Sequence, residues 1–229
     1  MPLILSCEHA SARVPARYAA AFSSRAAQLA LASHRGVDLG ALALARDLSR
    51  TCRVPLLAGQ QTRLLIELNR SPGHRALLSQ WSRQLPRARI AELHAIHEAH
   101  LQELARRVRQ ARGFPLHVAV HSFTPVLAGQ VRAFDVGLLY DPARPREVAL
   151  AERLRQGLRD YGLSVRRNAP YRGRADGAPT WLRRQFPDRR YAGLELEVNQ
   201  EFLWHTPDPQ KRRRLLDALT LVLARPAPG

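Results

Sequence analysis

Apolar positions along the chain follow two different periods. Short runs rich in branched aliphatic residues, such as residues 116–120, are typical of buried strands. Longer segments repeat apolar residues every three or four positions, as residues 90–112 do, and this indicates amphipathic helices. We predict strands at 3–6, 54–58, 63–68, 116–120, 135–140, 163–167 and 192–198, and helices at 26–33, 40–50, 90–112, 147–161, 179–186 and 210–224.

The alternation of strands with helices predicts an α/β fold. Such a pattern builds βαβ units around a mostly parallel or mixed sheet with helices on both faces. The chain has 229 residues, of which 45% are hydrophobic, so it can bury a substantial core. We therefore expect residues 1–229 to form a single domain.

The formal net charge of +17 raises the possibility of nucleic-acid binding. However, Lys211 is the only lysine, and the arginines are spread between apolar positions of the predicted helices. This distribution is typical of solvated helix faces, with residues 211–214 as the densest run. We do not expect a nucleic-acid partner, although a basic surface could attract a small anionic substrate.

The chain offers no sign of secretion or membrane insertion. The apolar run after the first residue is short and lacks a basic segment before it, unlike a signal peptide. No apolar stretch approaches the roughly 20 residues that span a bilayer. Two cysteines, Cys7 and Cys52, fit unpaired thiols in a reducing compartment. We expect a cytoplasmic protein.

Polar side chains follow several predicted strands at the point where each strand ends. His9, Asn69-Arg70, His121-Ser122 and Glu197 all lie at such positions. In open α/β sheets the ligand site lies beyond the carboxyl ends of the strands, so we expect these groups to converge. Two imidazoles and a carboxylate can hold zinc and leave a position open for water. A separate glutamate could move a proton, and an arginine could bind a carboxylate or a developing oxyanion.

Two further groups of polar residues need separate interpretations. Glu195 and Glu197 point to the same face of their strand, and Glu197 is the better candidate base because it lies nearer the carboxyl end. His94, His97 and His100 recur every three residues on one predicted helix. A metal clip is conceivable there, but we favour surface histidines or histidines that support the site from behind.

Several sequence blocks together resemble the N-formylglutamate amidohydrolase family. They occur in the family's order and extend over residues 3 to about 200. The blocks are 6–11 with Val14-Pro15, 34–40, 62–64, 67–70, 121–125, 135–140, 168–171 and 193–198. The resemblance implies a phosphorylase/hydrolase-like α/β fold, shared with zinc carboxypeptidases and with the aspartoacylase and succinylglutamate desuccinylase group.

The resemblance also implies roles for particular residues. Residues 67–70 are similar to the Asp-Leu-Asn-Arg motif of the aspartoacylase group, in which the Asn-Arg pair binds the substrate carboxylate. By this likeness Asn69 and Arg70 bind the carboxylate, while Arg63 supports the carbonyl oxygen. On the same basis, the metal ligands are His9 and His121, and the general base is Glu197.

The chain departs from the carboxypeptidase pattern at the third metal ligand. That group supplies a carboxylate three residues after the first histidine, where this chain has Ala12. We favour Asp38 over Glu8 as the replacement, and the alternative is that Asp38 only caps the helix that begins near Gly40. Imidazole ligands favour zinc among divalent metals, although manganese or iron would also fit. Loop residues Arg132, Tyr171 and Asn168, together with Ser122, are further candidates for the substrate pocket.

The expected function is hydrolysis of an N-acyl amino acid, with N-formyl-L-glutamate as the leading substrate. One alternative is the same chemistry on another N-acyl amino acid or a peptide-like amide, because the sequence does not reveal the specificity pocket. A second is a non-catalytic basic protein that binds nucleic acid or another anionic surface. The ordered set of His9, His121 and Glu197 favours the enzyme, since a basic binding protein needs none of these residues.

Overall fold

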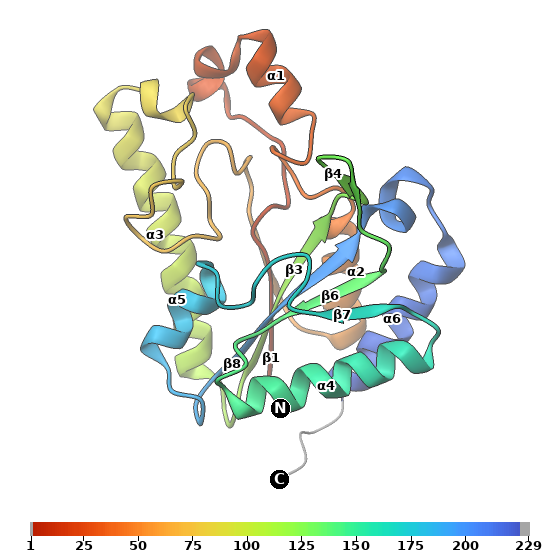
Figure 1. The fold of residues 1–229 in the computed structure, drawn as a ribbon. Helices are drawn as coiled ribbons and strands as arrows, with labels where there is room; N and C mark the ends of the chain where they lie inside the picture. The colour runs from red at the N-terminus through yellow and green to blue at the C-terminus, as the bar shows by residue number, and fades with distance from the viewer. Residues whose placement is uncertain (1, 225–229) are drawn as a thin grey trace.

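A computed structural model describes residues 2–224 of the chain as one α/β domain (Figure 1). A six-stranded sheet forms its centre, with the strand order β2-β1-β3-β8-β6-β7. The strands are β1 (Leu3–Cys7), β2 (Leu56–Ala58), β3 (Leu116–Phe123), β6 (Val136–Leu139), β7 (Val165–Arg167) and β8 (Ala192–Asn199). β4 (Val126–Leu127) and β5 (Gln130–Val131) form a separate hairpin. The predicted α/β class with a mixed sheet is confirmed.

The sheet is parallel from β2 to β8 and changes direction at β6. β1 pairs in parallel with β2 and β3, and β3 pairs in parallel with β8. β6 is antiparallel to β8, with Gly137 opposite Glu197, and β7 runs parallel to β6. The carboxyl ends of β1, β3 and β8 therefore meet at one edge, and the beginning of β6 lies at that same edge.

Helices cover both faces of the sheet (Figure 1). One face packs on α2 (Ala41–Cys52), α4 (Pro145–Asp160) and α6 (Pro209–Ala224), and this contact forms the largest apolar cluster. The other face carries α3 (Arg87–Gln110) and α5 (Ala178–Gln185). The remaining helical segments are α1 (Arg25–Leu31), the 3-10 helices η1 (Ala16–Phe22) and η2 (Ser82–Gln84), and the π-helical η3 (Glu201–His205).

Strand periodicity separates the core from the polar residues. Successive side chains of a strand point to opposite faces. On β3, Leu116, Val118 and Val120 join the apolar cluster with α2, α4 and α6. His117 and His121 therefore point to the opposite face, together with Glu195 and Glu197 of β8. This face, near the carboxyl ends of the parallel strands, carries the candidate site.

The predicted strand at residues 63–68 is wrong. These residues form buried turns, in which Leu65 N–H donates to Thr62 O at 3.0 Å and Glu67 N–H donates to Leu77 O at 2.9 Å. Leu64, Leu65 and Ile66 pack into a second apolar cluster with Tyr18, Phe22 and Trp81, away from the sheet. A short apolar run indicates that a segment is buried, but it does not show whether the segment pairs with a neighbouring strand. Residues 63–68 therefore have the sequence pattern of a strand without forming one.

The other predicted elements are present, with ends displaced by a few residues, as is usual for helix and strand boundaries. β3 and β8 extend beyond their predicted ends to include Phe123 and Asn199. Within residues 2–224, none of the helices has the combination of length and apolar character that crossing a membrane requires. Both cysteines are free thiols, as expected.

Candidate active site

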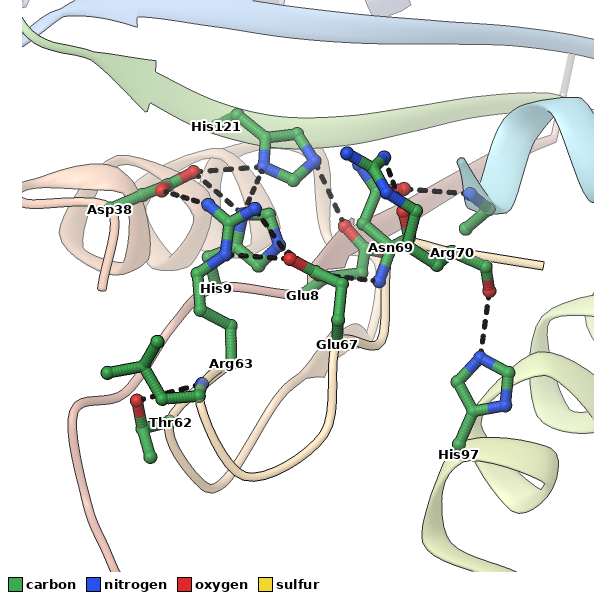
Figure 2. Close-up of polar contacts among 12 residues, drawn as sticks. Glu8, His9, Asp38, Thr62, Arg63, Glu67, Asn69, Arg70, His97 and His121 are labelled. Atoms are coloured by element: carbon green, nitrogen blue, oxygen red, sulfur yellow. Dashed lines mark hydrogen bonds and ion pairs between the residues drawn. The ribbon is translucent and has the colours of Figure 1, made fainter. Parts of the chain in front are cut away.

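Three donor atoms meet at the carboxyl edge of the sheet. His9 follows β1, His121 lies on β3, and Asp38 lies in the turn before α2. Asp38 Oδ2 lies 3.1 Å from His9 Nδ1 and 3.0 Å from His121 Nδ1, and the two Nδ1 atoms are 3.2 Å apart (Figure 2). All three residues are buried. The structure thus brings together the three residues that the sequence predicts as metal ligands.

The alternative role of Asp38 as a helix cap is wrong. The N-cap of α2 is Gly40, with a φ of 80°, and no side chain caps that end. The carboxylate of Asp38 instead points to the two imidazoles (Figure 2). A backbone hydrogen bond also joins Asp38 to the segment after β1: the Asp38 N–H donates to His9 O at 3.1 Å.

The donor set fits a divalent metal ion. Bonds of about 2.0–2.1 Å to a tetrahedral zinc place neighbouring donor atoms roughly 3.3 Å apart, close to the observed separations. Three carboxylates and one guanidinium surround this point: Asp38, Glu8, Glu67 and Arg63. With both imidazoles neutral they leave two negative charges, which a divalent cation would balance.

The second nitrogen of each imidazole faces another carboxylate. His9 Nε2 lies 2.5 Å from Glu67 Oε1, and His121 Nε2 lies 3.2 Å from Glu8 Oε2. Arg63 donates from Nε to Glu67 Oε2 at 2.7 Å and from Nη1 to Asp38 Oδ1 at 3.4 Å. Imidazoles that bind metals commonly have such a carboxylate on the far nitrogen. The cluster is therefore a connected set of charges with its Nδ1 atoms turned inward.

Opposite charges dominate the electrostatics of the cluster. Burial alone would raise the pKa of Asp38, but His9 and His121 outweigh it and hold that pKa far below its usual range. Burial likewise opposes ionisation of Glu67, while Arg63 and His9 keep its pKa low. Burial disfavours the charged form of His121, yet contacts with Asp38 and Glu8 raise its pKa. The carboxylates are therefore ionised and ready to act as ligands or acceptors.

Glu197 differs from the other carboxylates of the site. Burial raises its pKa to about 8: His121 and His9 oppose this rise, whereas the carboxylates of Asp38 and Glu195 add to it. Its Oε2 is buried and has no hydrogen-bond partner among the described residues. On β6, Gly137 is paired with Glu197. A Cβ atom at position 137 would lie 3.3 Å from the Cβ of Glu197. A raised pKa brings the ionisation of this carboxyl close to neutral pH, where it can exchange a proton beside the cluster of imidazoles and carboxylates.

A cavity of about 240 Å³ opens above the cluster. Its wall includes nearly all of the predicted site residues and several that sequence reasoning missed. The predicted ones are His9, Asp38, Arg63, Asn69, Arg70, His121, Ser122, Tyr171 and Glu197, and the missed ones include His34, Arg172 and Asp176. His34 occurs in a sequence block quoted above, whereas Arg172 and Asp176 lie in a loop with no distinguishing local pattern.

The Asn69-Arg70 pair is held firmly at the wall of the cavity. Asn69 Oδ1 accepts from Ala178 N–H at 2.7 Å, at the beginning of α5. Arg70 Nη1 donates to Asp176 O at 2.5 Å and to Asn69 O at 3.1 Å. The Arg70 Nε is buried and has no partner among the described residues. Although the preceding strand is absent, the turns at 63–68 still deliver this pair to the cavity.

The remaining predicted pocket residues differ in their placement. The Ser122 hydroxyl donates to Leu39 O at 2.8 Å and accepts from Gln200 Nε2 at 3.0 Å. The Arg132 guanidinium lies 5.4 Å from the ring centre of Tyr171, outside the cavity wall. Asn168 Oδ1 accepts from the backbone N–H groups of Tyr140 and Gly173. Asn168 is therefore absent from the cavity wall, and its side-chain oxygen holds the loop that follows β7.

The helical histidines lie behind the site. His97 and His100 are buried, whereas His94 is exposed. His97 Nε2 donates to Arg70 O at 2.8 Å (Figure 2), and His100 Nε2 lies 3.4 Å from Glu8 Oε1. The surface interpretation therefore holds for His94, while His97 and His100 contact residues of the site.

The α/β sheet, with a cavity of imidazoles and carboxylates at its carboxyl edge, defines a hydrolase-like α/β protein. The sequence assigns the family more closely. The family model for N-formylglutamate amidohydrolase matches residues 1–204. The chain therefore belongs to the N-formylglutamate amidohydrolase family, and the resemblance seen in its sequence blocks is confirmed.

Two solved structures share the fold. A gene product from Agrobacterium tumefaciens is 27% identical, with a TM-score of 0.76, over 97% of this chain and 88% of that one. An N-formylglutamate amidohydrolase from Ralstonia eutropha is 20% identical, with a TM-score of 0.61, over 96% of this chain and 90% of that one. A search of the curated proteins finds no match. Family and fold together support an amidohydrolase.

Proposed function

We propose that the chain is a metal-dependent amidohydrolase that cleaves the acyl group from an N-acyl amino acid, with N-formyl-L-glutamate as the leading substrate. The observation that carries the proposal is the convergence of His9 Nδ1, His121 Nδ1 and Asp38 Oδ2 at 3.0–3.2 Å beside Glu197. Family membership supports the amide chemistry. The residue roles that follow are parts of this proposal.

His9, His121 and Asp38 are the residues that would hold the ion, and zinc is the favoured one. When bound, a divalent metal polarises the acyl oxygen and lowers the pKa of water. Glu197 acts as general base: in its ionised form, its carboxylate takes a proton from the attacking water and delivers it to the nitrogen of the leaving amino acid. The Oε2 of Glu197 is free of hydrogen bonds to the described residues, which leaves it available for this transfer.

The arginine side of the cavity suits an anionic substrate. Arg70 is held by two backbone carbonyls, so its remaining N–H groups are oriented in advance for a substrate carboxylate. Asn69 uses its oxygen on Ala178 and keeps its amide N–H groups for the same carboxylate. Arg63 uses part of its five N–H donors on Glu67 and Asp38, and the others stabilise the developing oxyanion.

Tyr171, Ser122 and Arg132 have lesser roles in the proposal. Tyr171 and Ser122 line the cavity and contact the substrate, while Arg132 supports Tyr171 through its ring. The cavity volume of about 240 Å³ suits a small metabolite rather than a polypeptide. We therefore favour a free N-acyl amino acid over a peptide-like amide.

The test combines metal analysis with hydrolysis. We expect the purified protein to contain close to one divalent ion per chain by mass spectrometry and to release formate from N-formyl-L-glutamate. A chelator should abolish the release and added zinc should restore it. N-acetyl-L-glutamate and N-formyl-L-leucine, assayed in parallel, vary the acyl group and the amino acid separately.

Each outcome has a defined meaning. Chelator-sensitive release of another acyl group, with N-formyl-L-glutamate untouched, would retain the chemistry and replace the substrate. Turnover that is unaffected by chelation would overturn the role of the metal. Absence of both metal and turnover, even after zinc is added, would overturn the proposed function.

A further inference from the structure

Glu8 is a buried carboxylate that the proposed reaction does not use. Its side chain is fully enclosed, and it does not belong to the wall of the cavity above the cluster. Its two oxygens face two imidazoles: Oε2 lies 3.2 Å from His121 Nε2, and Oε1 lies 3.4 Å from His100 Nε2. Among the described residues Glu8 Oε2 and His121 Nε2 have no hydrogen-bond partner, so the ion pair between them is the only polar contact at either atom.

Burial of an isolated carboxylate costs several kcal/mol, so its surroundings must compensate for the charge. The backbone holds Glu8 tightly: its carbonyl oxygen lies only 2.1 Å from where a Cβ at Gly59 would be, and Gly59 N–H donates to Cys7 O at 2.9 Å. Residues 8 and 9 therefore contact the cluster at two different points. His9 contributes its own Nδ1, while Glu8 reaches the far nitrogen of His121.

A carboxylate on the far nitrogen of an imidazole has a definite effect. It keeps the proton on Nε2, leaves the lone pair of Nδ1 free for a metal, and holds the ring in one orientation. Glu67 occupies the equivalent position on His9, but the charge of Glu67 is also matched by Arg63. Among the described residues, the charged partners of the Glu8 carboxylate are the imidazoles of His121 and His100.

We propose that Glu8, anchored by His100 of α3, is a positioning residue that holds His121 with Nδ1 directed at the metal and thereby tightens metal binding. This inference rests on the proposed function, because it assigns Glu8 to the metal of that same site. His100 extends the support to α3, so a helix on the same face of the sheet contributes to the orientation of a ligand on β3.

The test measures metal affinity directly, by competition with a chromophoric chelator for zinc in otherwise intact protein. Loss of such a supporting partner weakens metal affinity by about 10- to 100-fold. We expect a loss of this size for Glu8→Gln, which keeps the shape of the side chain but removes its charge, and a smaller loss for His100→Gln. Glu98→Gln is the matched control, because Glu98 is an exposed residue of the same helix.

Thermal unfolding with and without zinc separates positioning from simple support of the fold. In the Glu8→Gln variant we expect the zinc-induced rise in melting temperature to shrink. A variant that unfolds earlier without metal, yet binds zinc as tightly as the wild type, would show that Glu8 only supports the fold and would overturn this inference alone. A wild-type protein that binds no zinc would overturn the metal chemistry of the proposed function, and this inference with it.

Discussion

Two histidines of β3 show how the same residue acquires opposite properties in one strand. His117 and His121 are four positions apart on the same face of the sheet, and both are buried. His121 lies between the carboxylates of Asp38 and Glu8, and these contacts raise its pKa despite burial. His117 lies between the hydroxyls of Ser6, at 2.7 Å, and Tyr191, at 2.9 Å, and burial lowers its pKa to about 4.

The comparison shows that partners, more than burial, decide the direction in which the pKa of a buried histidine shifts. His117 is a neutral ring that contacts two hydroxyls on the same face of the sheet, and no carboxylate is within its hydrogen-bond reach among the described contacts. His121 has a carboxylate at each nitrogen. The following predictions test this contrast, in order of decreasing effect.

Replacement of each histidine should separate the two roles most clearly. In His121→Gln we expect loss of the bound metal and a fall in kcat/KM of about a thousandfold or more, because several kcal/mol of charge stabilisation are removed. His117→Gln should retain the metal and keep kcat/KM within about tenfold of the wild type. Steady-state kinetics with metal analysis of both proteins measures this difference, and similar losses in the two variants would remove the distinction.

Substitution of Glu197 tests whether proton transfer takes place at the same edge of the sheet as His121. For Glu197→Gln we expect kcat to fall by about 10²- to 10⁴-fold, as for loss of a general base, with metal content unchanged. Glu195→Gln, two residues earlier on the same face of β8, is the matched comparison and should lose much less. A larger loss for Glu195→Gln would exchange the assignments of the two glutamates.

The lowered pKa of His117 should make stability depend on pH. The pKa of His117 is about 6.5 in the unfolded chain and about 4 in the folded protein, so folding disfavours protonation of this imidazole. The contribution of His117 to the free energy of unfolding is fully present above pH 6.5 and falls by about 3 kcal/mol as the pH drops to 4. Denaturant unfolding of the wild type and His117→Gln across this range should show their difference in unfolding free energy changing by that amount.

Several groups besides the two hydroxyls face His117 and also affect its pKa. After burial, the charges that affect its pKa are Glu8, His100, Arg183 and His121. His9 and His121 titrate in the same region of the protein, so only the difference between wild type and variant is diagnostic. A difference that stays constant from pH 7 to 4 would contradict a depressed pKa.

The smallest effect should come from Tyr191. Its hydroxyl contacts His117 Nδ1, and removing it leaves a buried nitrogen without that partner. Tyr191→Phe should lower the unfolding free energy by about 1–3 kcal/mol, with metal affinity unaltered. A change in metal affinity would show that the surroundings of His117 and the proposed metal site are coupled.

Much of the site could be predicted from the sequence because strand ends in an α/β sheet have a defined meaning. His9, His121 and Glu197 follow or end strands whose apolar patterns are clear, and the structure brings them together. Asn69 and Arg70 reach the cavity although the strand predicted before them is absent. Asn168, a predicted pocket residue, instead holds a loop through its side-chain oxygen.

The sequence by itself determined the α/β class, the main strands and helices, and the blocks that identify the family, because these follow from local periodicity and residue order. Only the tertiary structure decided that Asp38 faces the imidazoles instead of capping α2, and that residues 63–68 form turns whose apolar side chains belong to a separate cluster. The pairing of Glu8 with His121, 113 positions apart, was likewise decided by packing. These features depend on which distant groups share a buried space, and burial energy and charge compensation act between such neighbours regardless of their separation in the chain.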